Sequence, residues 1–164
     1  MKKLYLIRHA KSSWGDFNLP DFDRPLNTRG KTDAPVMAKR LLEKGIKIEA
    51  FISSPAKRAK RTCKYFCTAY HVKEEEIIFI DSLYLASLQT FFTVVKNLDN
   101  KYNSIALFSH NPGITEFANR LCKDVRIDDM PTCSIFAIES PAEKWKDFEE
   151  SENNFLFFDF PKNI

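Results

Sequence analysis

Short runs of apolar residues alternate along this chain with segments whose apolar residues recur every three to four positions. The short runs, which we expect to be β-strands, cover residues 3–7, 48–52, 77–80, 105–108, 134–138 and 155–160. The last run is rich in phenylalanine, and its length and aromatic content favour an end-of-chain strand over an exposed binding patch.

Helical periodicity marks the segments between these runs, at residues 30–43, 55–70, 88–98 and 114–121. Gly45 is placed to end the first segment. Ser54 followed by Pro55 predicts the start of the second, and Ser87 predicts the start of the third. Strands separated by helices are typical of βαβ units. We therefore predict one α/β domain over residues 1–164, a three-layer sandwich with a mostly parallel central sheet and helices on both faces.

The composition fits a folded domain of this size. The chain has 164 residues, of which 44% are hydrophobic and 29% are charged, and this excludes disorder of the whole chain. Twenty-five Lys and Arg residues against 22 Asp and Glu give a net charge of +3. This small excess is spread along the chain, whereas nucleic-acid-binding domains are usually far more basic, with a clustered patch. We therefore expect no nucleic-acid partner.

Two features bear on the cellular compartment. Only four apolar residues, 4–7, precede Arg8, which is too short for a signal peptide or a membrane span. The four cysteines form no CxxC pair, so we expect reduced thiols that mostly fill the core. These features predict a cytoplasmic protein that has no membrane contact, with a monomer as the default assembly.

Histidines and arginines follow three of the predicted strands. Arg8 and His9 end the first strand, Arg58 lies shortly after the second, and His110 ends the fourth. Because open α/β sheets bind ligands at the carboxyl ends of their strands, we expect these four side chains to converge. The third histidine of the chain, His71, lies in a polar stretch and is expected to have no role.

These side chains suit phosphoryl chemistry. Guanidinium groups bind phosphate oxygens at two points. A neutral imidazole whose Nδ1 proton is held by a backbone carbonyl presents Nε2 as a nucleophile. Nearby arginines would lower the pKa of His9 and stabilise charge on the phosphoryl oxygens. The two histidines lack metal-ligand spacing, so we expect neither a metal nor another cofactor.

Motifs that occur in order between residues 4 and 138 resemble those of the histidine phosphatase (phosphoglycerate mutase-like) superfamily. Residues 6–12 read L-I-R-H-A-K-S, and the A-K-S-S-W form at 10–14 resembles the small bacterial phosphohistidine phosphatases of the SixA type. The other motifs are R-P-L-N-T-R-G at 24–30, S-S-P-A-K-R-A at 53–59 with Thr62, S-H-N-P at 109–112 and M-P-T at 130–132. The resemblance implies the phosphoglycerate mutase-like form of the sandwich.

The resemblance also implies roles for individual residues. His9 would be the nucleophile and form a phosphohistidine intermediate. The residues that would bind the phosphoryl group are Arg8, Arg58, His110, Ser12 and the backbone N–H of Asn111. The implied partner is a protein that carries phosphohistidine, such as a phosphotransfer domain or a carrier protein.

One position departs from the superfamily pattern. Members that cleave phosphate esters place a Glu two residues beyond a Leu after the third strand, whereas residues 81–86 here read D-S-L-Y-L-A. Leu85 stands at that position, and the spacing of Asp81 does not match. An ester expels an alkoxide, which needs an acid. Phosphohistidine expels an imidazole whose conjugate acid has a pKa of about 6.5, so solvent can protonate it. The absence of a Glu at this position therefore favours phosphohistidine over a phosphate ester as the substrate.

Two alternatives use the same residues. A small-molecule phosphomonoester phosphatase could employ Asp81 or a group of the substrate as the acid. A phosphate-binding module without catalysis is also conceivable, although binding alone would need only the arginines. The loop 13–29 is the one segment long enough to cover the site.

Overall fold

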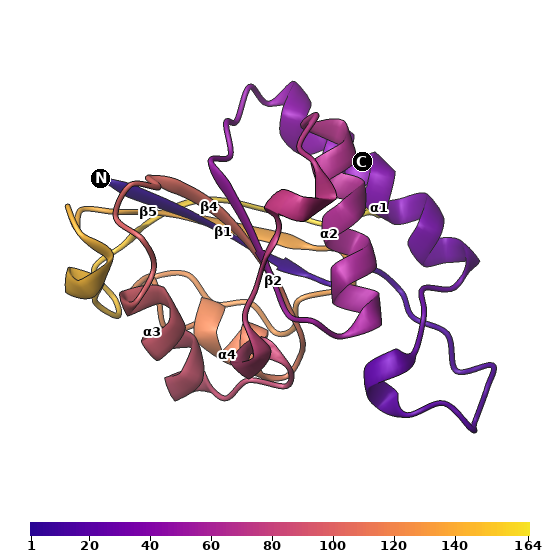
Figure 1. The fold of residues 1–164 in the computed structure, drawn as a ribbon. Coiled ribbons are helices and arrows are strands. Elements are labelled where there is room, and N and C mark those ends of the chain that lie inside the picture. Colours follow the sequence, from indigo (N-terminus) through magenta and orange to yellow (C-terminus); the bar gives the residue numbers. More distant parts are fainter.

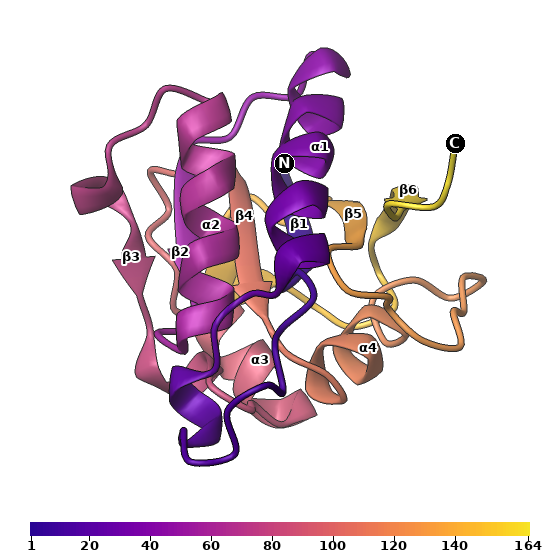
Figure 2. The ribbon, with the colours of Figure 1, turned by 90° about the vertical axis from the view of Figure 1, so that its right-hand side faces the viewer.

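Six strands form one sheet (Figure 1), and their order across it is β3-β2-β4-β1-β5-β6 (Figure 2). The computed structural model describes all 164 residues. The strands are β1 (Lys2–Arg8), β2 (Ala50–Ser53), β3 (Ile78–Phe79), β4 (Ser104–Ser109), β5 (Ile135–Ser140) and β6 (Asn154–Asp159). β1 to β4 are mutually parallel along the sheet, and β5 is antiparallel to both β1 and β6. The mostly parallel sheet predicted from the sequence is confirmed.

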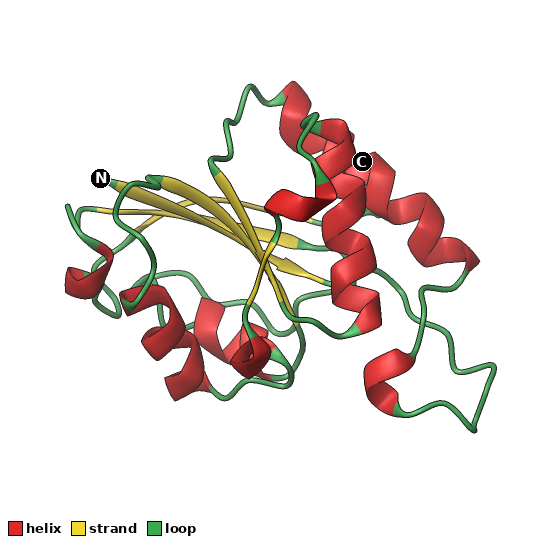
Figure 3. Cartoon of the chain, in the orientation of Figure 1, coloured by secondary structure: helices red, strands yellow, loops and turns green.

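Helices cover both faces of this sheet (Figure 3). The four α-helices are α1 (Thr28–Glu43), α2 (Lys57–Ala69), α3 (Leu88–Lys96) and α4 (Gly113–Ala118). Short 3-10 turns occur at η1 (Asp21–Asp23), η2 (Glu74–Glu76), η3 (Asp81–Leu83) and η4 (Trp145–Asp147). Helices α1 and α2 lie on one face, and α3 and α4 lie on the other, which gives the predicted three layers.

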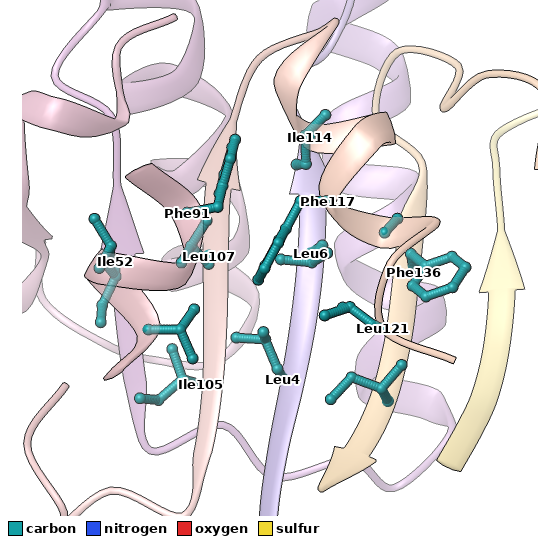
Figure 4. Packing of buried hydrophobic residues seen from close by; sticks show 14 of the residues in the cluster. Leu4, Leu6, Ile52, Phe91, Ile105, Leu107, Ile114, Phe117, Leu121 and Phe136 are labelled. Carbon is teal, nitrogen blue, oxygen red and sulfur yellow. The ribbon is translucent and has the colours of Figure 1, made fainter. Parts of the chain in front are cut away.

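The alternation of side chains along β1 produces two separate cores. Leu4 and Leu6 point to the layer of α3 and α4, whereas Tyr5 and Ile7 point to the layer of α1 and α2. Figure 4 shows Leu6 beside Phe117 of α4 within the first of these cores. Because both faces are covered, β1 is apolar over its whole interior rather than at every second residue.

Two helix starts differ from their prediction. Helix α1 begins at Thr28, two residues early, because the side chain of Asn27 accepts a hydrogen bond from the N–H of Gly30. Helix α2 begins at Lys57 rather than Pro55, and no side chain caps it. The hydroxyl of Ser54 has another hydrogen-bond partner, His110, in the site described below. The predicted cap at Ser87 is confirmed, since its side chain accepts from the N–H of Thr90.

The remaining sequence expectations concern the thiols and the chain end. All four cysteines are buried and none forms a disulfide. The Phe-rich run near the end of the chain pairs with β5 as strand β6, as expected. None of the helices has the length and apolar character that crossing a membrane would require.

Candidate active site

The register of β1 and β4 brings two histidines side by side. Arg8 pairs with Ser109 across these parallel strands, so the next residues, His9 and His110, leave the sheet together. Their ring centroids are 5.3 Å apart. Arg58 reaches the same edge from the first turn of α2, which follows β2. Figure 2 shows the chain after β1 (indigo) passing beside the start of α2.

His9 is held as a neutral imidazole with a defined tautomer. Its Nδ1 lies 2.7 Å from the carbonyl oxygen of Ala10, so Nδ1 carries the proton and Nε2 presents a lone pair. The pKa of His9 lies well below its ordinary value, chiefly because the ring is buried. The positive charges of Arg58 and Arg8 lower this pKa further, so the expected effect of the arginines is present but is secondary to burial.

The loop after β1 is tied to α2 by one threonine. The hydroxyl of Thr62 accepts a hydrogen bond from the N–H of Ala10 at 2.9 Å and donates one to the carbonyl of Arg58 at 2.8 Å. The peptide that orients His9 is therefore fixed relative to the helix turn that carries Arg58.

Arg58 is held in place by Asp21. Its Nη1 donates to the backbone carbonyl of Asp21 at 2.7 Å, and its Nη2 donates to Oδ2 of the same residue at 3.0 Å. The Tyr84 hydroxyl donates to Oδ2 at 2.6 Å, and Arg24 Nε donates to Oδ1 at 3.1 Å. Burial acts to raise the pKa of Asp21, but the hydrogen bonds from Tyr84 and Arg58 outweigh it and bring the pKa to about 2. Asp21 is thus a carboxylate at neutral pH.

His110 is also neutral, and one of its ring nitrogens forms a hydrogen bond with Ser54. Burial and the charge of Arg58 lower the pKa of His110 to about 3. Its Nε2 lies 2.7 Å from Oγ of Ser54, which also accepts a hydrogen bond from the N–H of Ala56. If the Ser54 hydroxyl donates to Nε2, its one proton has a partner and the imidazole proton is on Nδ1. We infer this tautomer from the network.

Three buried polar groups of these residues have no hydrogen-bond partner in the protein. They are Nε of Arg8, Nε of Arg58 and Nδ1 of His110. Buried donors are nearly always satisfied, and these three belong to side chains around one cleft. An oxyanion with several acceptor oxygens would satisfy all three.

The cleft has a volume of about 240 Å³ and gathers every site residue predicted from the sequence. Its lining residues are Arg8, His9, Lys11, Ser12, Trp14, Asp21, Arg24, Arg58, Leu85, His110, Asn111 and Thr132. Ser12 accepts a hydrogen bond from Arg24 at 3.0 Å, so its hydroxyl is oriented by the loop. The side chain of Asn111 donates to Asp129 at 2.7 Å and thereby holds the segment before Thr132. His71 is exposed and does not line the cleft.

Several functional side chains were not predicted from the sequence. Asp21, Trp14 and Arg24 all belong to the loop 13–29, which forms one wall of the cleft. Arg24 belongs to the R-P-L-N-T-R-G motif at 24–30 and could have been proposed as a site residue. Asp21 precedes that motif in an aperiodic loop, and no pattern distinguishes it from Asp23.

The position of the general acid is occupied by an apolar residue. Leu85 lines the cleft, whereas Asp81 is exposed and lies outside it. Asp21 is the one carboxylate among the lining residues, and it is ionised. The cleft thus holds a neutral imidazole with a free lone pair and cations that could bind an oxyanion, but no carboxylic acid that could protonate a leaving group at neutral pH.

Comparisons with known proteins bear on the family to which this chain belongs. Residues 4–81 match the model of the histidine phosphatase superfamily (branch 1). An uncharacterised chloroplastic protein of Arabidopsis thaliana is 30% identical over 154 residues, which cover 89% of this chain and 70% of that protein. A 2,3-bisphosphoglycerate-dependent phosphoglycerate mutase of Gloeothece citriformis is 38% identical over 72 residues, 43% of this chain and 31% of the mutase.

Solved structures share the fold over almost the whole chain. The SixA protein of Agrobacterium tumefaciens superposes with a TM-score of 0.83 at 22% identity, covering 98% of both chains. The protein histidine phosphatase SixA complexed with tungstate gives a TM-score of 0.82 at 20% identity, with the same coverage. The ordered motifs, the matching family model and the shared fold together lead to one conclusion: this chain belongs to the histidine phosphatase superfamily.

Proposed function

We propose that this chain is a phosphatase that removes the phosphoryl group from phosphohistidine on a protein, with His9 as the nucleophile. The observation that carries the proposal is the composition of the cleft, where Leu85 stands at the position of the acid and the single carboxylate, Asp21, is ionised. Such a site suits a leaving group that departs without a proton from the enzyme. Imidazole meets this condition far better than an alkoxide.

The reaction follows from the geometry in two displacements. In the first, the free ring nitrogen of the substrate phosphohistidine takes a proton from solvent. Nε2 of His9 then bonds to phosphorus while the bond between phosphorus and the substrate ring breaks, and the ring leaves as neutral imidazole. In the second, water attacks the phosphorus of phospho-His9, the bond from phosphorus to Nε2 breaks, and inorganic phosphate leaves. Arg8, Arg58 and His110 carry the unpartnered donors that would hold the phosphoryl oxygens in both steps.

Relatives of similar fold support this choice of reaction. The SixA structure with tungstate is described as a protein histidine phosphatase, and tungstate is a tetrahedral oxyanion like phosphate. The mutase relative matches over less than half of this chain. The alternative function, a small-molecule phosphatase, is distinguished by the experiment below.

The test measures how the rate depends on the leaving group. We expect the wild-type protein to hydrolyse a phosphohistidine peptide and an aryl phosphate far better than alkyl monoesters such as sugar phosphates, with kcat/KM rising steeply as the leaving-group pKa falls. Leu85→Glu should improve the alkyl esters selectively, because it adds an acid at the cleft. His9→Ala should abolish turnover of all substrates and the acid-labile phosphoenzyme.

Each outcome has a distinct meaning. Equal kcat/KM for alkyl and aryl esters in the wild type would require an acid in the cleft, and the small-molecule reading would replace ours. Stoichiometric labelling of His9→Ala would place the covalent intermediate on another residue.

A further inference from the structure

A basic groove lies beside the catalytic cleft. Its volume is about 580 Å³, and it shares no lining residue with the cleft. It is lined by Phe22, Asp23, Pro25, Leu26, Lys31, Pro55, Lys57, Lys60, Arg61 and Lys64. The two depressions are neighbours because η1 and the start of α2 contribute to both. Asp21 and Arg58 line the cleft, and the adjacent Phe22 and Lys57 line the groove.

The charge of the groove comes mainly from one face of α2. Lys57, Lys60, Arg61 and Lys64 are spaced as i, i+3, i+4 and i+7, which places them on a single helix face. Lys31 of α1 adds a fifth cation.

Very little of this charge is neutralised within the protein. Lys64 is the one cation of the five with a carboxylate within 4 Å, Glu74 at 3.3 Å. Asp23 is the single acidic residue that lines the groove. The net charge of +3 for the whole chain therefore conceals a local concentration of positive charge.

This arrangement does not help α2 to fold. The helix contains no acidic residue, so its neighbouring cations repel one another. Lys57 and Lys60 also stand in its first turns, where the helix dipole favours negative charge. The stability of α2 comes from the opposite face, where Ala59, Cys63 and Phe66 are buried. Four of the five cations are exposed and available to a partner, whereas Lys64 is half-buried and paired with Glu74.

We infer that the basic groove is a docking surface for an acidic patch on the protein that carries the phosphohistidine. This inference rests on the proposed function and specifies the partner. The cleft is sized for a phosphoryl group and its imidazole, while the larger, separate groove would bind carboxylates of the protein around that histidine. Cations next to a reaction site raise the association rate of a partner of opposite charge.

An acidic protein fits this surface better than a nucleic acid does. Phe22 is the single aromatic residue that lines the groove, and its ring is in T-shaped contact with Tyr84 at 5.0 Å between centroids, whereas single-stranded nucleic acids stack successive bases on several aromatic side chains. The turn η1 lines both the groove and the cleft, so a partner held in the groove would have its neighbouring histidine close to His9.

The test compares two phosphohistidine peptides of equal length, one flanked by Asp and Glu and one flanked by Ser and Gly. The groove variant is Lys60→Glu with Arg61→Glu, and added Glu in the first turns of α2 favours folding. The matched control is Lys96→Glu with Lys146→Glu, two exposed lysines on the other face of the sheet. Both double variants change the net charge from +3 to −1. An aryl phosphate reports on the cleft alone.

In the wild type we expect kcat/KM for the acidic peptide to exceed that for the neutral peptide by about tenfold or more at low salt, within the range of electrostatic steering. The groove variant should lose this preference, while the control should retain it and both should hydrolyse the aryl phosphate at nearly the wild-type rate. The preference should also shrink as ionic strength rises.

Three results would overturn the inference. The first is an acidic-peptide preference that survives in the groove variant or is absent from the wild type. The second is an equal loss of aryl phosphate and peptide turnover, which would mean that these cations act on the cleft. The third is tight binding of a labelled DNA duplex that the groove variant loses, which would identify a nucleic-acid surface. Failure of the wild type to hydrolyse either peptide, with aryl phosphate still cleaved, would instead refute the proposed function and the inference that rests on it.

Discussion

At the scale of single residues, the capacity of the site to bind a ligand depends on which polar atoms of its side chains form hydrogen bonds within the protein and which have no partner there. The guanidinium of Arg58 gives two donors to Asp21 and keeps Nε without a partner. Asp21 therefore orients Arg58 and leaves part of it for a ligand. Ser54 has the corresponding relation to His110. A residue that orients a ligand-binding group matters through position rather than through contact with substrate.

Substitution of Arg58 tests this arrangement directly. Arg58→Ala should lower kcat/KM by about 10²–10³, because one donor to the transition-state charge is lost. Arg58→Lys should recover only part of the rate, since an ammonium cannot reproduce the planar fork that contacts Asp21 and a phosphoryl oxygen. The measurement is steady-state kinetics with an aryl phosphate, with circular dichroism to check the fold. Near-wild-type turnover in Arg58→Ala would mean that the phosphoryl group is held by other residues.

At the scale of elements, the first turn of α1 supports the loop that carries His9. A Cβ on Gly30 would lie 2.2 Å from the carbonyl oxygen of Lys11, and this neighbour is backbone that cannot rotate away. The same carbonyl accepts a hydrogen bond from the N–H of Asn27 at 3.0 Å. Close contact between α1 and residue 11 thus fixes the loop two residues beyond His9, the proposed nucleophile.

Gly30→Ala separates packing from helix propensity. Propensity alone predicts that alanine stabilises a helix by up to about 1 kcal/mol relative to glycine. Overpacking against Lys11 costs about 1–3 kcal/mol, so we expect net destabilisation together with a reduced kcat. Denaturant unfolding measures the change in stability, and aryl phosphate turnover measures the change in kcat. Gly15→Ala, where the new Cβ would meet only the Ser13 side-chain hydroxyl at 3.2 Å, should change both much less. A gain in stability for Gly30→Ala would contradict the close contact.

At the scale of the whole molecule, two buried neutral histidines make stability depend on pH. Burial lowers the pKa of both His9 and His110 in the folded state, to about 3 for His110, whereas the unfolded chain titrates near pH 6.5. Between these values the unfolded state binds more protons, so stability is complete above about pH 6.5 and falls as the pH falls.

The expected loss is about 1.4 kcal/mol per pH unit for each histidine below pH 6.5. Denaturant unfolding at pH 6.5, 5.5 and 4.5 measures it, in a window above the titration of Asp21, whose pKa is about 2. His110→Gln should show a shallower slope, because only His9 then contributes. A wild-type stability that is constant over this window would mean that the imidazoles are protonated in the folded state or remain accessible to solvent.

The sequence by itself determined the succession of strands and helices along the chain, the two-sided apolar character of the sheet and the set of residues at its edge. These features follow from local patterns, since a strand such as β1 or a cap such as Ser87 is specified by neighbours within a few positions. The six predicted site residues line one cleft for the same reason, because parallel strands end at one edge.

Only the tertiary structure decided what surrounds those residues. Asp21 lies in an aperiodic loop, and its pairing with Arg58, 37 residues away, depends on how that loop folds over α2. Ser54 was expected to cap a helix, but its hydroxyl lies against His110, which comes from a strand 56 residues further on. The basic groove is an intermediate case. The helical spacing of its four α2 cations can be read from the sequence, whereas only packing brings Lys31 of α1 beside them and sets the groove next to the cleft. Local pattern specifies which element a residue joins, and packing between distant elements specifies which groups it meets.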